Sequence, residues 1–388
     1  MRIAVIGGGI GGLAATLQLR AAGFDAQVYE QARELGEIGA GIQISPNASR
    51  LLIRLGLGAA LDAKGVRPVA GHQRRWEDGR TIQRSVLNPD VEQIFGAPYY
   101  HFHRADLLEA LSGALPASSI HVSHRLVQLA DNGSSVELSF ANGRSAGADL
   151  VIGADGIHSR VREHLFGPEK PRFTGCIAYR GLVPRERLER LRLATESANW
   201  HGPHGHFVHY FVAGGRLHNF VAVREQDEWV RESWTDPAEI GEALAAFEGW
   251  HPTVHAIIAA ADRTFKWGLF DRDPLASWTR GRVALLGDAC HAMLPFMAQG
   301  AAQSIEDGAT LAACLRAEND VTVALKRYEA LRRPRATRLQ EMSRANKIRF
   351  HLPDGPEQEE RDAQQAKLGD RSPTALGWLY EHDAGRLD

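Results

Sequence analysis

The sequence opens with Arg2-Ile-Ala-Val-Ile6 and continues directly into Gly7-Gly-Gly-Ile-Gly-Gly12. The first run is short and apolar, which predicts a buried strand, and the second contains the pattern G-x-G-x-x-G. Apolar residues at four-residue spacing then predict a helix over 11–22 that ends at Gly23, and a second strand follows over 26–30. This β-α-β unit favours an α/β fold with a parallel sheet and helices on both faces.

Each glycine of the pattern has a separate task in holding a dinucleotide. Gly7 permits the tight turn, Gly9 lets the backbone approach a pyrophosphate, and Gly12 lets the helix pack closely on the strand. The helix N-terminus offers free N–H groups and a partial positive charge to the phosphates. Glu30 ends the second strand, where an acidic side chain accepts hydrogen bonds from an adenosine ribose. We therefore expect a dinucleotide here; the alternative is a glycine-rich turn beside an unrelated glutamate.

Composition excludes several other classes of protein. The chain has 388 residues, 44% hydrophobic residues and a formal net charge of −2, so it lacks the electrostatic footprint of a nucleic-acid or membrane-surface protein. We expect no membrane span, because no apolar run reaches roughly 18 residues. The N-terminus has no signal-peptide pattern, and the cysteines, Cys176, Cys290 and Cys314, are too far apart for a CxxC motif. We expect a cytoplasmic protein.

A later strand and glycine turn favour FAD over NAD as the dinucleotide. The apolar run over 282–286 ends in Gly287-Asp288, and Gln299-Gly300 then begins a helix. Asp288 is suitably placed to bond the ribityl hydroxyls of an extended dinucleotide, and the helix would direct its N–H groups at the pyrimidine edge of a flavin. The single complete G-x-G-x-x-G argues against a reductase with two nucleotide domains. The alternative for Asp288 is a turn or helix-capping residue.

With these residues in order, the chain resembles the single-component (group A) flavoprotein aromatic hydroxylases, the class of p-hydroxybenzoate and salicylate hydroxylases. The stretches that carry the resemblance are Gly7–Gly12, Glu30, Gly39–Asn47, His103–Leu107, Gly153–Arg162, Gly287–His291, Pro295 and Met297–Ala301. Ala292 is a departure, since these relatives often carry proline there. Within the class, 200–210 and 297–301 look most like salicylate hydroxylase, 3-hydroxybenzoate 6-hydroxylase and 6-hydroxynicotinate 3-monooxygenase.

The resemblance implies an α/β architecture: a Rossmann-like FAD-binding domain of the p-hydroxybenzoate hydroxylase type, an antiparallel β-sheet substrate domain and C-terminal helices. We expect the FAD-binding domain over 1–72 plus 98–170 plus 270–352, the substrate domain over 73–97 plus 171–269, and a C-terminal tail over 353–388 that is mobile or lies on the surface. Within this frame, a meander is expected from strands over 119–123, 125–130 and 135–140. The substrate domain is expected to hold strands over 176–183, 207–212 and 217–224 and a helix over 237–248, and long helices are expected over 302–316 and 321–349.

The resemblance also implies non-covalently bound FAD, with NADH or NADPH as co-substrate. Beyond Gly7, Gly9 and Gly12, the implied cofactor contacts come from Glu30, Gln43, Arg104, Asp155, Gly287, Asp288, Gly300 and Ala301. Asp155-Gly156 belongs to a motif that serves NAD(P)H in this family. Gln43 occupies the position of a histidine in one pyridine-acting relative, which weakens a hydroxynicotinate assignment.

Trp200-His-Gly-Pro-His-Gly-His-Phe-Val-His-Tyr210 is the densest cluster of functional side chains. If 205–212 is a strand, His206, Val208 and Tyr210 share one face, with His206 and Tyr210 about 13 Å apart. Neighbouring histidines then point to opposite faces without a carboxylate at ligand spacing, so we expect no metal; surface histidines are the plainer alternative. The relatives place a catalytic histidine and tyrosine at positions matching His206 and Tyr210, and a glutamine at Gln299.

The resulting prediction is an FAD-dependent monooxygenase that uses NAD(P)H and O₂ to hydroxylate a small hydroxylated aromatic acid, such as salicylate or 3-hydroxybenzoate, through a flavin hydroperoxide. A histidine of near-neutral pKa suits the deprotonation of a phenol, which enriches the ring in electrons. Alternatives are a hydroxylase of a hydroxypyridine carboxylate such as 6-hydroxynicotinate, a flavin oxidoreductase without oxygen insertion, and a catalytically silent flavoprotein. We expect a role in aromatic catabolism, as a monomer or homodimer.

Overall fold

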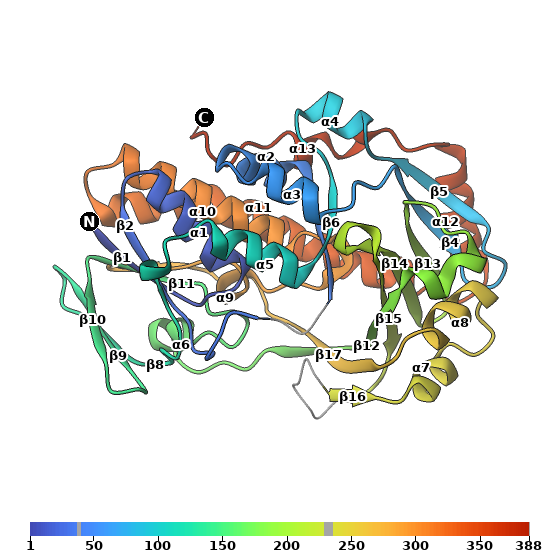
Figure 1. Cartoon of the computed structure of the whole chain (residues 1–388), viewed down its shortest axis with the longest axis horizontal. Coiled ribbons are helices and arrows are strands. Elements are labelled where there is room, and N and C mark those ends of the chain that lie inside the picture. Colours follow the sequence, from blue (N-terminus) through green and yellow to red (C-terminus); the bar gives the residue numbers. More distant parts are fainter. Residues whose placement is uncertain (37–39, 229–235, 388) are drawn as a thin grey trace.

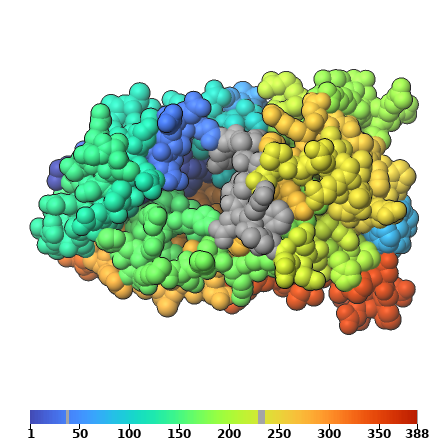
Figure 2. Space-filling view, turned by 90° about the horizontal axis from the view of Figure 1, so that it is seen from below, coloured from blue at the N-terminus to red at the C-terminus, as the bar shows by residue number. Residues whose placement is uncertain are grey.

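The computed structural model describes residues 1–36, 40–228 and 236–387. Figure 1 shows an elongated molecule with a parallel sheet and its helices at one end and a larger, mainly antiparallel sheet at the other. The same two ends are visible from below, with β8–β10 at one end and α7 and α8 at the other (Figure 2). Within the described residues, no helix combines the length and the apolar character that crossing a membrane requires.

The six-stranded sheet contains the β-α-β unit that the opening sequence predicts. Its order is β18-β19-β11-β1-β2-β7, and all neighbours are parallel except β18 and β19. The strands are β1 (Arg2–Ile6), β2 (Asp25–Tyr29), β7 (Ile120–His121), β11 (Leu150–Gly153), β18 (Thr279–Arg280) and β19 (Val283–Leu285). The predicted strand over 119–123 therefore does not belong to the meander, because β7 pairs with β2 at the edge of this sheet.

Helices surround the six-stranded sheet and share its core. They are α1 (Ile10–Ala21), α5 (Arg104–Gly113), α6 (Arg160–Phe166), α9 (Asp288–His291), α10 (Gly300–Ala317) and α11 (Val321–Phe350). Leu13 of α1, Ile305 of α10 and Tyr328 of α11 are completely buried in one cluster with Val5 and Ile152 of the sheet. The predicted helices over 11–22, 302–316 and 321–349 are confirmed within two residues at each end.

Two small sheets extend this end of the molecule. The meander is β8 (Leu126–Asp131), β9 (Val136–Phe140) and β10 (Ser145–Ala148), and β3 (Gly41–Ile44) pairs with β6 (Tyr100–His103). Helices α2 (Pro46–Arg54), α3 (Gly58–Lys64) and α4 (Asp90–Phe95) lie along the upper side of the molecule in the view of Figure 1. Gly39, in one of the stretches that carry the family resemblance, falls outside the described residues.

The eight-stranded sheet has the order β16-β17-β12-β15-β14-β13-β4-β5, and only β13 and β4 are parallel. Its strands are β4 (Ala70–Arg75), β5 (Thr81–Val86), β12 (Arg172–Pro184), β13 (Ser197–Gly202), β14 (Gly205–Val212), β15 (Leu217–Glu225), β16 (Asp236–Ala238) and β17 (Thr264–Asp271). The mainly antiparallel character of this sheet is confirmed. The helix predicted over 237–248 is shorter, α7 (Ile240–Ala246), and α8 (Pro252–Ala259) follows it.

The two faces of the eight-stranded sheet carry different neighbours because side chains alternate along each strand. On one face, Trp200, Phe207 and Phe220 pack against α7 and α8 through residues such as Phe247 and Val254. On the other face, the residues that pack together include Ala178 and Val223 of the sheet, Phe296 of the 3₁₀ turn η4 (Pro295–Met297) and Phe350 of α11. This second face is therefore turned toward the parallel-sheet end.

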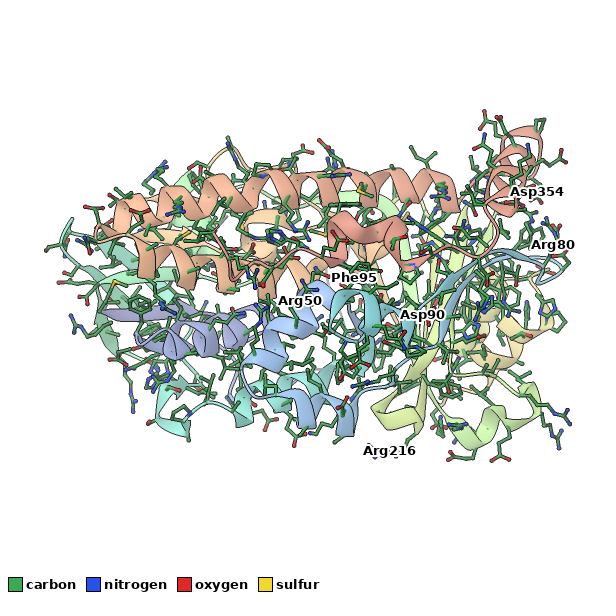
Figure 3. All side chains as sticks on the ribbon, turned by 90° about the horizontal axis from the view of Figure 1, so that it is seen from above. Arg50, Arg80, Asp90, Phe95, Arg216 and Asp354 are labelled. Atoms are coloured by element: carbon green, nitrogen blue, oxygen red, sulfur yellow. The ribbon has the colours of Figure 1, made fainter. Side chains whose placement is uncertain are left out.

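The C-terminal segment folds back onto the larger sheet instead of lying loosely on the surface. It contains α12 (Pro356–Lys367) and α13 (Gly377–Tyr380). Buried Arg75 of β4 donates to Asp354 at 2.5 Å, and Arg80 donates to buried Asp362 of α12. Figure 3 shows Arg80 and Asp354 at the same end of the molecule. The polar composition of this segment predicted exposure, and much of it is exposed, but Asp354 and Asp362 are paired with arginines of the sheet.

Candidate active site

Three glycine turns that are far apart in the sequence meet at one edge of the parallel sheet. The last residues of three neighbouring strands are in register, with Ile6 of β1 beside Gly153 of β11 and Gly153 beside Leu285 of β19. Because parallel strands end at the same edge, the loops that follow them must lie together. This is the edge at which open α/β sheets bind ligands, so the turns predicted separately form one candidate site.

The first turn has the geometry that its glycines predict. Gly7 has φ +111°, and a Cβ there would lie 2.4 Å from the backbone oxygen of Ala154. A Cβ on Gly12 would lie 2.0 Å from the oxygen of Gly7, so only glycine allows the helix to pack so closely. By contrast, a Cβ on Gly9 would meet no atom within 4 Å. Gly9 is also the N-cap of α1 without a side-chain cap, which leaves the helix N–H groups open to a phosphate.

Glu30 lies at the end of β2 beside this turn and is held there by the backbone. Its carboxylate accepts from the N–H of Gly8 at 2.6 Å and from that of Ala32 at 2.7 Å. Each carboxylate oxygen retains a further acceptor position. Glu30 can therefore accept hydrogen bonds from ribose hydroxyls without moving, which fits the adenosine end of FAD.

The third turn brings Asp288 next to the start of α10. Asp288 is exposed, and one of its carboxylate oxygens lies 3.9 Å from the position of a Cβ on Gly300. A Cβ on Gly287 would meet Ser304 Oγ at 2.7 Å, and one on Gly11 would meet Ser304 Cβ at 2.9 Å. The first and third turns thus converge on Ser304. Gly300 and half-buried Ala301 begin an 18-residue helix without a side-chain cap, so its N-terminus also fits a flavin edge.

Three other predicted cofactor residues have protein partners of their own. Asp155 accepts from Ser159 Oγ at 2.5 Å and from the N–H of Arg160 at 2.7 Å, so its carboxylate caps α6. Arg104 begins α5, where its backbone N–H donates to Ala40. Gln43 of β3 accepts from the hydroxyl of Tyr99 at 2.6 Å. Asp155 shapes the turn beside Gly7, while the other two lie on and next to the β3–β6 pair.

The histidine-bearing strand β14 begins two residues before the expected range of 207–212 and matches the range 205–212 for which the alternation was worked out. His206 and Tyr210 are buried on the face turned toward the parallel sheet, whereas Val208 between them is only partly buried. Val221, paired with Val208 on the same face, is partly exposed as well. We call this partly exposed stretch of the sheet face, with His206 at one end and Tyr210 at the other, the floor of the candidate site.

His206 stands at one end of this floor. Its ring contacts that of Phe296 edge-on, with centroids 4.7 Å apart, and its Nδ1 lies 2.7 Å from Nε2 of His351. Burial holds the pKa of His206 well below its ordinary value, and nearby His351 lowers it further. His206 is therefore a neutral imidazole near neutral pH. Phe296 belongs to the loop that connects Asp288 to Gly300, so this loop joins the candidate cofactor turns to the sheet face.

Tyr210 stands at the other end of the floor, against the β3–β6 pair. Its ring lies 4.4 Å from that of His101, and a Cβ on Gly41 would approach it within 2.7 Å. Burial raises the pKa of Tyr210, and a hydrogen bond with Gln43 offsets this only in part. The Tyr210 hydroxyl is therefore neutral and available as a hydrogen-bond donor.

The side chain of Gln299 lies in a buried polar network below the start of α10. It donates to Ser45 Oγ at 2.9 Å and accepts from Asn47 at 3.2 Å. Asn47 in turn donates to Glu306, which is also paired with Arg332. Burial acts to raise the pKa of Glu306, but arginine neighbours outweigh it and bring the pKa to about 2. The structure therefore brings His206 and Tyr210 to one floor and places the Gln299 side chain in a network that holds α10.

A buried cation of β12 lies on the same sheet face. Arg180 of β12 is 4% exposed, and its guanidinium lies 4.8 Å from the Trp267 ring centroid. Arg180 is paired with Val221, which is paired with Val208, so all three side chains point to one side of the sheet. The backbone of Arg180 is roughly 12 Å from that of His206, by strand spacing and rise. A long guanidinium side chain at this position suits recognition of a substrate carboxylate.

Three residues that complete this neighbourhood have no signal in the sequence. Arg180 stands in an ordinary strand, Phe296 in a loop, and His351 at the end of a long helix. His206 and His351 are 145 positions apart. Only contacts in the folded structure identify Arg180, Phe296 and His351, because none of them belongs to a local motif.

Cys290, His291 and Asp307 form the one group of three side chains with metal-ligand proximity among the residues described. Their donor atoms lie within 4.8 Å of one another, and all three are buried. Asp307 already accepts from the N–H of Gly287, from His291 at 2.6 Å and from Arg332 at 2.7 Å. Burial raises the pKa of the Cys290 thiol well above its ordinary value, which disfavours the thiolate that a metal binds. These contacts occupy the Asp307 carboxylate and one ring nitrogen of His291 without an ion.

A surface cavity of about 440 Å³ lies elsewhere, between α2, α4 and the C-terminal segment. Arg50 and Phe95 line it, and Figure 3 shows the two side by side. The Arg50 guanidinium donates to the backbone oxygens of Phe95, Tyr380 and Glu381. Arg54 and Arg386, which also line the cavity, are paired with Asp383, so its arginines are occupied with the protein itself and the cavity is distinct from the glycine turns.

Comparison with known proteins agrees with this geometry. The family model described as "FAD binding domain" matches residues 1–343. The chain is 44% identical over 390 residues to 3-amino-4-hydroxybenzoate 2-monooxygenase PtmB3 of Streptomyces platensis, which covers 99% of this chain and 96% of that protein. It is 40% identical over 350 residues to 6-hydroxynicotinate 3-monooxygenase of Pseudomonas fluorescens, with coverage of 89% and 91%. A solved salicylate hydroxylase substrate complex has a TM-score of 0.83 and 29% identity, over 99% of this chain and 96% of that one.

Proposed function

Because this chain belongs to the FAD binding domain family and is an FAD-dependent aromatic-ring monooxygenase, we propose that it hydroxylates a small benzoate that already carries a ring hydroxyl. NADH or NADPH and O₂ are the proposed co-substrates. An aminohydroxybenzoate is the first candidate, as in the relative of 44% identity, and a hydroxypyridine carboxylate is the alternative. Gln43 supports the benzoate, since one pyridine-acting relative has histidine at that position.

The observation that carries the proposal is the position of neutral, buried His206 beside the loop between Asp288 and Gly300. FAD, when bound, supplies the chemistry by which nicotinamide electrons activate O₂. We assign Gly7, Gly9, Gly12 and Glu30 to its adenosine diphosphate portion. We assign Arg104, Gly287, Asp288, Gly300 and Ala301 to its ribityl and ring portions, with Gln43 at the flavin's side of the substrate space and Asp155 shaping the turn.

His206 is proposed as the base that takes the proton of the substrate hydroxyl. A phenolate donates electron density to its ortho and para carbons, which makes the ring a better nucleophile toward an electrophilic oxygen. A neutral imidazole held by Phe296 and His351 has the free ring nitrogen that this step needs. Tyr210 is proposed to donate to the substrate from the other end of the floor, and Gln299 to hold the start of α10 in place.

The residues proposed to line the substrate space would also exclude water and bind the substrate carboxylate. Val208, Val221, Phe296 and Phe350 are apolar, so they exclude water from the reacting ring. Arg180 is the proposed partner of the substrate carboxylate, because it is a buried cation on the face that carries His206. A hydroxylated ring bearing a carboxylate therefore finds both a base and a cation on one face of the sheet.

A substrate panel tests the proposal. The FAD-loaded protein is incubated with NADH or NADPH and with 3-amino-4-hydroxybenzoate, 3-hydroxybenzoate, salicylate or 6-hydroxynicotinate, and both cofactor oxidation and product mass are measured. We expect at least one acid to stimulate cofactor oxidation and to gain one oxygen atom. Stimulated oxidation without a change of mass would instead indicate an oxidoreductase that inserts no oxygen. No response to any acid would contradict the proposed substrate class.

A further inference from the structure

A chain of hydrogen-bonded side chains runs from buried His206 to the protein surface. His206 Nδ1 lies 2.7 Å from His351 Nε2, and His351 Nδ1 lies 3.0 Å from Glu225 Oε1. The second Glu225 oxygen lies 3.1 Å from Nδ1 of His204. The side chain of His351 is 1% exposed, that of Glu225 is 34% exposed and that of His204 is 61% exposed. Each link is of ordinary hydrogen-bond length, and exposure rises along the chain.

The fold holds these groups together from three directions. His206 belongs to β14 and Glu225 ends β15, while His351 is the C-cap of α11. The backbone N–H of His204 donates to the oxygen of His351, and the N–H of Glu225 donates to the oxygen of His204. Figure 1 shows α11 extending from the parallel-sheet end toward this sheet. Backbone bonds thus keep the four side chains in contact.

Glu225 determines which ring nitrogens carry protons. An ionised carboxylate only accepts hydrogen bonds, so His351 must carry its proton on Nδ1 and have a bare Nε2. That bare nitrogen can only accept, so His206 must carry its proton on Nδ1. His206 Nε2 is then left with the free electron pair. This is the arrangement that a base toward the substrate requires.

We propose that His351 and Glu225 form a proton relay that connects His206 to the surface at His204. This inference rests on the proposed role of His206 as the base. His206 Nε2 takes the proton of the substrate hydroxyl, and the Nδ1 proton of His206 passes to His351 Nε2. The Nδ1 proton of His351 passes to Glu225, and the partly exposed carboxyl of Glu225 releases it to water beside His204. One proton enters and one leaves, and no electrons move.

The charges around the relay explain why one is needed. Burial lowers the pKa of His206, so this imidazole cannot hold a second proton for long. Burial, Lys347 and Arg224 oppose a charge on His351, whereas Glu225 favours it. His201 of β13 adds a further imidazole close to both rings. Hydrogen bonds from His351 and His204 help to lower the pKa of Glu225 to about 2, so the carboxylate is ionised at rest and releases quickly any proton that it takes up.

Variants of Glu225 separate a relay from a merely structural contact. Glu225→Gln keeps an acceptor for His351 but cannot take up a proton, while Glu225→Asp keeps the carboxylate. The FAD-loaded protein without NADH is mixed rapidly with 3-amino-4-hydroxybenzoate in a weakly buffered indicator dye, which reports proton release. We expect Glu225→Gln to slow the release about tenfold or more and Glu225→Asp to retain most of the rate. His218→Gln, in a histidine pair on the other face of the sheet, is the control and should release protons at the wild-type rate.

A wild-type rate in Glu225→Gln would overturn the relay, as would equal slowing in Glu225→Gln and Glu225→Asp. Full proton release in His206→Asn would instead contradict the proposed base. A second measurement needs no ligand, since nitrogen-15 spectra of histidine-labelled protein report where each imidazole proton lies. The relay requires protons on Nδ1 of His206 and of His351 in the wild type. A proton on Nε2 of either histidine would overturn it, whatever the substrate is.

Discussion

Strand β14 carries a buried histidine pair on each of its faces, and the two pairs differ in what lies beyond them. On one face His206 bonds His351 at 2.7 Å, and on the other His209 Nδ1 lies 2.9 Å from His218 Nε2. The first pair continues to Glu225. The outer ring nitrogens of the second pair, His209 Nε2 and His218 Nδ1, are buried without a hydrogen-bond partner among the described residues.

The difference shows that a histidine pair becomes useful to a reaction through its outer partner. The Glu225 carboxylate fixes the tautomers of the first pair and connects this pair to the protein surface. The pair of His209 and His218 has no such carboxylate among the described residues, so no charged group determines which of the two rings donates the hydrogen bond between them. Burial lowers the pKa of His218 to about 3 and that of His209 well below its ordinary value. We infer that this pair acts in packing, beside Trp200, Phe207 and Phe211.

Removal of His206 should have the largest effect. We expect His206→Ala to lose about 10²–10⁴-fold in the rate of product formation, since that is the usual contribution of a general base. FAD should remain bound, because the glycine turns are untouched. The measurement is oxygenated product formed per NADH oxidised, together with the flavin content. His209→Ala removes an imidazole from the opposite face and should keep most of the hydroxylation rate; unchanged coupled hydroxylation in His206→Ala would remove this residue from the mechanism.

Burial of the His209 and His218 pair should make the free energy of unfolding depend on pH. Below about pH 6.5 the unfolded chain binds a proton at His218, whereas the folded protein does so only near pH 3. The free energy of unfolding must therefore fall as the pH drops from 6.5 toward 3, by about 2 kcal/mol at pH 5 from His218 alone.

Urea unfolding at pH 7 and pH 5, with equal FAD, measures this difference. His218→Gln should show a smaller loss between the two pH values than the wild type does. His351→Gln should reduce the loss less, because Glu225 opposes the effect of burial on His351. Identical losses in the wild type and His218→Gln would show that burial of this imidazole does not set the pH dependence.

The smallest effect is expected at Tyr210, on the same face as His206. Tyr210→Phe removes one hydroxyl donor, whose net hydrogen-bond contribution of about 0.5–1.5 kcal/mol corresponds to about a two- to tenfold loss of coupling. The measurement is again product formed per NADH oxidised. Tyr100→Phe is the matched control, because the Tyr100 hydroxyl bonds Asp62 and Arg67 elsewhere. A loss as large as that of His206→Ala would give Tyr210 a greater share of the chemistry than we assign to it.

The nucleotide-binding end of the molecule was predictable because its signals are local. Gly7, Gly12 and Glu30 lie within one β-α-β unit. The tight turn at Gly7 and the close helix packing at Gly12 both follow from the glycine pattern in the sequence. The bounds of β14 were equally accessible, since alternation along a strand is a short-range property. The domain boundaries and the roles of the individual site residues stay predictions.

The sequence-based predictions were incomplete where the position of a short segment depends on contacts with residues far away in the chain. Residues 119–123 have the pattern of a strand, but the pattern does not say which sheet the strand joins, and β7 pairs with β2. The polar C-terminal segment was expected to be mobile or to lie on the surface; it lies on the larger sheet, where Asp354 and Asp362 pair with Arg75 and Arg80, and its sequence did not predict these pairs. A charged residue is predicted to be exposed from the sequence alone, because a sequence does not show the partner that would allow the charge to be buried.

The sequence alone determined that three glycine turns follow three apolar strands, that a histidine-rich strand stands far from them, and that the family is one of flavoprotein hydroxylases. Tertiary structure alone decided that His351 meets His206, that Glu225 anchors the pair, and that Arg180 shares their face. The physical reason is range. Backbone conformation depends on neighbours along the chain, whereas the protonation of a buried imidazole depends on groups that only folding brings within a few ångströms.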